Sequence, residues 1–310
     1  MVIKCYYGKA RHHFRGQDRE TWTAAWRRVD IAQAARGADR DRLAPLFRRY
    51  FPRPPQRILE GGCGTGKYVI AYRRLGYDII GVDFSSETVA RIKAFDPALP
   101  VACADVCSLP FEDGFFHCYY SGGVLEHFEA GPRRLLGEAH RVLAPGGLLL
   151  ATVPYVNVLR RLGFVRTPAA LQTRALWYAQ RGECRTEPPP EGYNFAEYLF
   201  ELSELRQHFR ANAFRVERVH HCDLLHGEVG LALHQVWLRL KSSSGGRRGR
   251  SKGSPESGQQ CGDGASASGW KGVVRQVFVG EDPDHHLLRC LVRSLGRLAG
   301  HMVAVAARAV

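Results

Sequence analysis

The feature that most restricts the fold of this chain is a glycine-rich turn at residues 58–68, with the sequence ILEGGCGTGKY. Residues 61–66 hold four glycines. A short apolar run that ends in an acid precedes them, and a stretch able to form a helix follows. Glycine tolerates positive φ and lets a ligand approach the backbone, while the start of a helix offers unpaired N–H groups. The turn therefore predicts a nucleotide-type site between a first strand and a first helix.

Downstream of this turn, apolar runs of strand length alternate with helical stretches. This alternation predicts an α/β fold, with a doubly wound, mostly parallel sheet covered by helices on both faces. The expected strands are 57–61, 77–83, 100–106, 115–121, 146–154, 214–222 and 301–310, and the expected helices are 66–75, 85–95, 131–143, 202–213, 227–240 and 286–298.

The remaining segments suggest how the domain is organised. Residues 1–56 are predicted to be a basic N-terminal helical segment, and 57–240 with 271–310 to be one catalytic domain. Within it, residues 155–192 contain the loop-like EPPPEG and are expected to form a cap insertion over the carboxyl edge of the sheet. Residues 241–270 are rich in Gly and Ser and poor in apolar residues, so we expect a disordered insertion there.

The positive charge of the chain is concentrated in two places. Formal net charge is +14, of which +8 falls in residues 1–56 and +3 in residues 241–270. Such segments suit RNA, anionic lipid or an acidic acceptor, and equally an arginine-rich solvated surface. No run approaches ~18 apolar residues, which argues against a transmembrane segment, and the first residues lack the apolar core of a secretory signal. Nine cysteines without a CxxC pair favour reduced thiols and a cytoplasmic location over disulfides or zinc.

Two common phosphate-binding motifs fail at the glycine turn. A P-loop requires G-x-x-x-x-G-K-[ST], and Tyr68 stands where its hydroxyl ligand to magnesium would be. The dinucleotide fingerprint G-x-G-x-x-G places Lys67 or Val69 at its last glycine. The pattern that fits is E-x-G-x-G-x-G, formed by Glu60, Gly62, Gly64 and Gly66.

With this pattern the chain resembles the class I S-adenosylmethionine-dependent methyltransferases, in particular their small-molecule, type-11-like branch. Further segments match in order: GYDIIGVDFSSETV, ADVCSLPFEDGFFHCYYSGGVLEHF, EAHRVLAPGGLLLATVP and LGRLAGHMVAVAARAV. The resemblance covers roughly residues 57–240 and 271–310. It implies a seven-stranded Rossmann-like sheet with an antiparallel last strand, S-adenosyl-L-methionine as cofactor, and methyl transfer as the activity.

The resemblance also implies roles for individual residues. Asp83 would accept hydrogen bonds from both ribose hydroxyls, and a carboxylate makes such bonds strong. Asp105 and the backbone of Val106 would face the adenine amino group, with Phe84 beside the ring. The remaining expected cofactor-binding residues are Glu60, which would reach the methionine amino group, with Gly62, Gly64, Gly66 and Ser121.

His127, in GGVLEHF, is the candidate catalytic residue. Histidine as a residue type suits a general base near neutrality, although displacement at a sulfonium needs a base only when the acceptor must lose a proton. His127 would otherwise shape the pocket floor. His220, His221 and Tyr193 are weaker candidates. Two departures from the family are His117, where an aspartate is common, and YYSGG, where enzymes that methylate base amines carry an Asn/Asp-Pro-Pro-Tyr type motif.

The acceptor pocket is expected between residues 155–200 and the N-terminal helices. Aromatic side chains either line it or form the core of the cap; they are Trp22, Trp26, Trp177, Tyr178, Tyr193 and Phe195. Such a pocket suits a small or lipid-like acceptor. The alternatives are an RNA methyltransferase that uses the basic N-terminal segment, a non-catalytic module that keeps the fold, and a nicotinamide-dependent oxidoreductase, which the glycine spacing disfavours. No metal site is expected.

Overall fold

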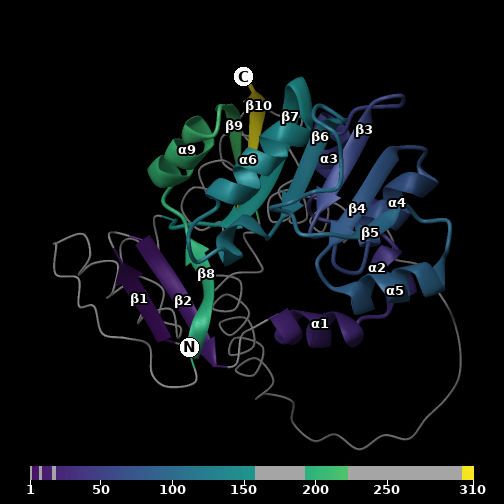
Figure 1. Cartoon of the computed structure of the whole chain (residues 1–310), viewed down its shortest axis with the longest axis horizontal. Coiled ribbons are helices and arrows are strands. Elements are labelled where there is room, and N and C mark those ends of the chain that lie inside the picture. Colours follow the sequence, from purple (N-terminus) through teal and green to yellow (C-terminus); the bar gives the residue numbers. More distant parts are fainter. Residues whose placement is uncertain (1, 7–8, 16–18, 158–192, 223–301) are drawn as a thin grey trace, which may run out of the picture.

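A seven-stranded sheet forms the centre of the molecule (Figure 1). The computed structural model describes residues 2–6, 9–15, 19–157, 193–222 and 302–310. The strand order is β5-β4-β3-β6-β7-β10-β9, and β10 runs antiparallel to the other six strands of this sheet. The strands are β3 (Arg57–Gly61), β4 (Asp78–Asp83), β5 (Val101–Cys103), β6 (Phe116–Gly122), β7 (Leu143–Pro154), β9 (Phe214–Cys222) and β10 (Met302–Ala309). The predicted α/β sheet with an antiparallel last strand is confirmed.

Helices cover both faces of this sheet, because its central strands are apolar on both sides. In β7, Leu148 and Leu150 pack into one hydrophobic cluster, whereas Leu149 and Ala151 pack into the other. Alternation along a strand sends successive side chains to opposite faces. The helices are α2 (Ile31–Ala35), α3 (Ala44–Tyr50), α4 (Lys67–Arg74) and α5 (Ser86–Phe95) against the first cluster, and α6 (Arg133–Val142) and α9 (Leu202–Ala211) against the second.

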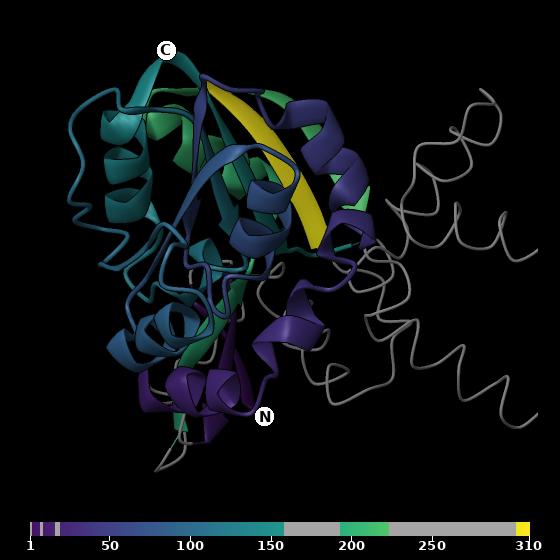
Figure 2. The same cartoon turned by 90° about the vertical axis from the view of Figure 1, so that its right-hand side faces the viewer.

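The N-terminal segment differs from the prediction. Residues 1–56 were expected to be helical, yet they begin with β1 (Val2–Tyr6) and β2 (Lys9–Arg15), which form a small antiparallel sheet with β8 (Tyr193–Leu199). The partner of β2, strand β8, begins almost 180 residues later in the chain. A local sequence pattern therefore cannot predict this pairing. Helix α1 (Arg19–Arg27) and the short turn η1 (Ala38–Arg40) follow. Both views place β1, β2 and α1 at the end of the molecule away from the C-terminus (Figures 1 and 2).

Several predicted segments fall outside the described residues. They are the insertion at 241–270, the helices at 227–240 and 286–298, and residues 158–192 of the expected cap, with Trp177 and Tyr178. The division of the chain into domains therefore remains a prediction. None of the helices in the described part of the chain is long and apolar enough to cross a bilayer.

Candidate functional site

The glycine turn joins β3 to α4 through residues with left-handed backbone. Gly62 and Gly64 have φ values of 73° and 51°, which favour glycine because a Cβ would crowd the backbone. A Cβ on Gly62 would also lie 2.6 Å from Cγ2 of Val124, closer than real contacts allow. The backbone N–H groups of Gly62 and Cys63 both donate to the carbonyl of Val82 in β4, at 2.8 and 2.9 Å. The turn therefore needs glycine, and it is fastened to the end of the neighbouring strand.

Asp83 ends β4 and is tied to the same turn. Its Oδ2 accepts the backbone N–H of Gly64 at 2.9 Å, and its Oδ1 accepts that of Ser85 at 3.0 Å. Burial raises the pKa of the Asp83 carboxyl, and these two backbone N–H groups partly offset the rise. A carboxylate oxygen offers about two acceptor directions, so each oxygen keeps room for a further donor.

A cavity of about 320 Å³ opens beside Asp83 at the carboxyl ends of the parallel strands. Its walls come from the glycine turn, the ends of β4 and β6, the loop after β5, the short turn η2 (Leu125–His127), and parts of α1 and β8. Ligands of open α/β sheets bind at this edge. Six of the predicted cofactor-binding and catalytic residues line the cavity: Gly62, Asp83, Phe84, Asp105, Val106 and His127.

The other predicted cofactor residues do not line this cavity. Gly64 and Gly66 shape the turn beside it, and Ser121 is fully buried in β6 with no hydrogen-bond partner for its hydroxyl. Glu60 is also buried, and its Oε2 has no partner. Burial raises the pKa of Glu60 to about 8, although nearby Lys67 and a hydrogen bond with the backbone of Val69 oppose the rise.

His127 lies on the aromatic side of the cavity. The ring centroids of His127 and Trp22 are 4.8 Å apart, and Trp26, Phe128 and Phe195 complete this wall. The other histidine candidates contact different groups: His220 Nε2 lies 2.7 Å from the Tyr50 hydroxyl and His221 Nδ1 lies 3.0 Å from that of Tyr155. Neither is among the residues that line the cavity.

Two features of the site escaped prediction. Glu126 precedes His127 and is buried, with Oε2 unpartnered and its pKa held well above the usual range by burial. Helix α1 crosses directly over the glycine turn: a Cβ on Gly64 would lie 3.1 Å from Cε2 of Trp26. The spacing of Trp22 and Trp26 predicted that both face one side, but nothing local predicted which surface they would cover.

A larger cavity of about 460 Å³ lies between α9 and β9, away from the glycine turn. It contains none of the predicted site residues, and its polar wall is mostly arginine. A bulge at Glu217 changes the pairing of β9 with β10 and sets Arg218 on the same face as Arg215. Within the described ranges, no group of three or more His, Cys, Asp or Glu side chains could hold a metal ion.

Comparison with known families identifies the segment that carries the glycine turn. Residues 59–151 match the family model described as a methyltransferase domain. This stretch begins in β3 and ends in β7, so it contains the turn, Asp83, Asp105 and His127.

Curated relatives align over the same region. A probable S-adenosylmethionine-dependent methyltransferase of Mycolicibacterium smegmatis is 30% identical over 97 residues, 31% of this chain and 37% of that protein. A demethylmenaquinone methyltransferase of Thermus thermophilus is 38% identical over 102 residues, 31% of this chain and 46% of that protein. A probable tRNA methyltransferase 9B of Mus musculus is 34% identical over 103 residues, 33% of this chain and 22% of that protein. The chain therefore spans less than half the length of these relatives.

Among solved structures, the complex between the Haloferax volcanii Trm112 methyltransferase activator and a methyltransferase contains a similar chain. The TM-score is 0.52 at 16% sequence identity, and the match covers 94% of this chain and 99% of that one. At this identity the likeness shows the fold.

Proposed function

We propose that this chain, which carries a class I S-adenosylmethionine-dependent methyltransferase domain, transfers a methyl group to a small-molecule acceptor. One observation carries the proposal. The cavity that contains Asp83, Asp105 and the glycine turn continues into an aromatic wall with His127. A cofactor and an acceptor would thus share one cavity.

The residues present fit S-adenosylmethionine, the cofactor of this domain. Asp83 keeps acceptor capacity for the ribose hydroxyls. Asp105 and Val106 line the same cavity and would form hydrogen bonds with the adenine. Glu60 does not line the cavity, but its buried Oε2 has no partner, and a water would link it to the cofactor's ammonium. When bound, this cofactor supplies an electrophilic methyl group on a sulfonium.

The chain's own contribution is then positioning and exclusion of water. Displacement at a sulfonium is in line, and its leaving group is neutral, so orienting the acceptor provides most of the acceleration. Trp22, Trp26 and Phe195 would hold the acceptor and keep water out. Where the acceptor must lose a proton, His127 is the group on that wall able to take it.

Calorimetric titration tests the cofactor assignment. We expect S-adenosylhomocysteine to bind with micromolar affinity, NADH not to bind, and Asp83→Ala to weaken the first ligand about tenfold or more, because charge-assisted bonds are lost. A labelled methyl donor then reports transfer to small molecules or to total RNA. Failure of folded protein to bind S-adenosylhomocysteine would overturn the proposal and favour a non-catalytic module, whereas NADH binding would favour the oxidoreductase.

RNA is the second candidate acceptor. A relative named as a tRNA methyltransferase matches the domain, and Arg206, Arg210, Arg215 and Arg218 line the cavity between α9 and β9. Phosphate contacts by arginine make binding strongly dependent on salt. RNA binding should then weaken steeply between 50 and 200 mM salt, and the label should appear in RNA but not in small molecules. These two results together would make RNA, in place of a small molecule, the acceptor.

A further inference from the structure

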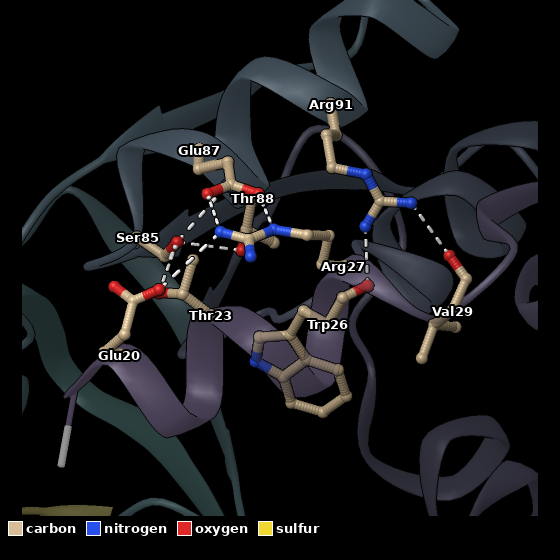
Figure 3. A network of polar contacts seen from close by, with 9 residues as sticks. All are labelled: Glu20, Thr23, Trp26, Arg27, Val29, Ser85, Glu87, Thr88 and Arg91. Carbon is tan, nitrogen blue, oxygen red and sulfur yellow. Dashed lines mark hydrogen bonds and ion pairs between the residues drawn. The ribbon is translucent and has the colours of Figure 1, made fainter.

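Helix α1 is attached to helix α5 by three sets of polar contacts (Figure 3). Thr23 Oγ1 donates to Ser85 Oγ at 3.0 Å. Arg27 makes a two-pronged ion pair with Glu87, at 2.6 and 2.7 Å. Arg91 donates to the carbonyls of Trp26 and Val29, at 2.5 and 3.0 Å. We call these five side chains, Thr23, Arg27, Ser85, Glu87 and Arg91, the α1–α5 clamp.

Helix α1 depends on this clamp because it adds no side chain to the core. No residue from Glu20 to Val29 is buried, whereas the following helices α2 and α3 bury Ile31, Ala35, Ala44, Leu46 and Phe47. An element with little buried apolar surface opens at low free energy. The clamp and the half-buried tryptophans are therefore what keeps α1 in place.

Arg91 is the central member of the clamp. The carbonyls at the end of a helix lack partners within the helix, and a basic side chain can satisfy them. At the end of α1, Arg91 adds a second donor to the carbonyl of Trp26, which also accepts the backbone N–H of Val29 at 3.0 Å. The ring of the same Trp26 covers Gly64. The planar guanidinium of Arg91 donates to the two carbonyls from two different nitrogens, a fixed spacing that the single nitrogen of lysine lacks.

The other end of the clamp reaches the carboxylate that faces the cavity. Ser85 accepts Thr23 through its hydroxyl, caps α5 by accepting the N–H of Thr88 at 3.2 Å, and donates its own backbone N–H to Asp83. The docking of α1 and the orientation of Asp83 are thus set by the same turn.

We propose that Arg91 and Glu87 are positioning residues of this site, which hold α1 across the glycine turn, and that release of α1 is the step by which S-adenosylhomocysteine leaves. The naming of that ligand rests on the proposed function; the docking of α1 does not. The two residues contribute unequally. Arg27 and Glu87 are 53% and 43% exposed, so their ion pair is screened and weak, whereas the Arg91 contacts are partly buried.

Two measurements test the proposal on the full chain. Surface plasmon resonance gives the dissociation rate of S-adenosylhomocysteine, and hydrogen exchange of the cofactor-free protein gives the opening of residues 19–29 relative to α4. We expect Arg91→Ala to raise both the dissociation rate and the exchange rate about tenfold. Arg91→Lys should raise both rates less than Arg91→Ala does. Glu87→Gln should raise both about threefold. The matched control is Arg74→Ala, an exposed arginine on α4.

The outcomes separate this proposal from the proposed function. The thermal midpoint of Arg91→Ala should stay within about 2 °C of wild type, because α1 is not in the core. Exchange and dissociation rates that both match those of Arg74→Ala would overturn the proposal. Selective loosening of residues 19–29 in a protein that binds no S-adenosylhomocysteine would support the clamp and overturn methyl transfer.

Discussion

The carboxylate of Asp83 and the backbone N–H of Gly64 are joined by a hydrogen bond of 2.9 Å, although the two residues are 19 positions apart. This bond links the end of β4 to the glycine turn after β3. It fixes the turn in the shape that opens the cavity, and it turns one face of the carboxylate toward that cavity. Asp83 therefore has a structural role in addition to the proposed role in binding, and a suitable substitution should separate the two.

Asp83→Asn should keep most of the fold and lose most of the binding. The amide retains one oxygen acceptor, but its NH₂ group would face a backbone donor, either that of Gly64 or that of Ser85. We expect S-adenosylhomocysteine to bind about tenfold to a hundredfold more weakly by calorimetry. Urea unfolding should show a loss of about 1–3 kcal/mol, since a buried N–H is left without an acceptor. Wild-type affinity in this variant would show that Asp83 serves only the turn.

The sequence was sufficient to predict the glycine turn and Asp83, because both belong to one strand–turn–helix–strand unit with a fixed order. The alternation of strands with helices likewise predicted the sheet, whose central strands are apolar on both faces. The parallel sheet also predicts that Gly62, Asp83 and Asp105 line one cavity, because parallel strands bring their carboxyl ends to one edge.

The covering elements could not be predicted in the same way. Helix α1 docks through contacts 60 or more positions apart in the sequence, such as Arg27 with Glu87 and Arg91 with the carbonyl of Trp26. In the sequence, these charged residues look like those of any solvated surface. Strand β2 pairs with β8, which lies almost 180 residues later in the sequence. Long-range contacts of this kind leave no local period in the sequence, so the small sheet at the N-terminus was mistaken for helix.

Glu60 should release its proton when the cofactor or its product binds. Its pKa is about 8 in the free protein, and a ligand ammonium would lower it, so affinity should rise with pH up to about 8. At pH 7 we expect release of about 0.5–0.9 proton per S-adenosylhomocysteine bound. Calorimetry in buffers of different ionisation enthalpy measures this number. Glu60→Gln should abolish the release, and an unchanged release in that variant would assign the proton to another group.

The same carboxyl should also affect stability. Its pKa is raised from 4.5 when unfolded to about 8 when folded, so the folded state binds the additional proton between these values. The free energy of unfolding should therefore fall as pH rises from about 4.5 to 8, with no further change from this group above that range. Urea unfolding of Glu60→Gln, which has no titrating group there, should show a shallower decline. Parallel pH curves for the two proteins would contradict the raised pKa.

Gly62→Ala should destabilise the turn more than its backbone angle alone requires. Gly76 provides the matched control: its φ is 82°, yet a Cβ there would meet no atom within 4 Å. Gly76→Ala should cost about 1–2 kcal/mol for the left-handed backbone. Gly62→Ala adds the clash with Val124, and we expect about 2–4 kcal/mol in urea unfolding. Equal losses would mean that Val124 moves aside without cost.

His127→Ala should separate chemistry from binding. His127 lies on the aromatic wall next to Trp22, on the side of the cavity assigned to the acceptor, so its loss should leave the affinity for S-adenosylhomocysteine within about twofold. If the acceptor must give up a proton, kcat should fall about a hundredfold or more, and higher pH should recover part of it because hydroxide can replace the missing base. His140→Ala, on α6 and outside the cavity, is the control and should keep wild-type kcat. A His127→Ala enzyme with unchanged kcat would instead make His127 part of the pocket floor, and the acceptor a group that needs no deprotonation.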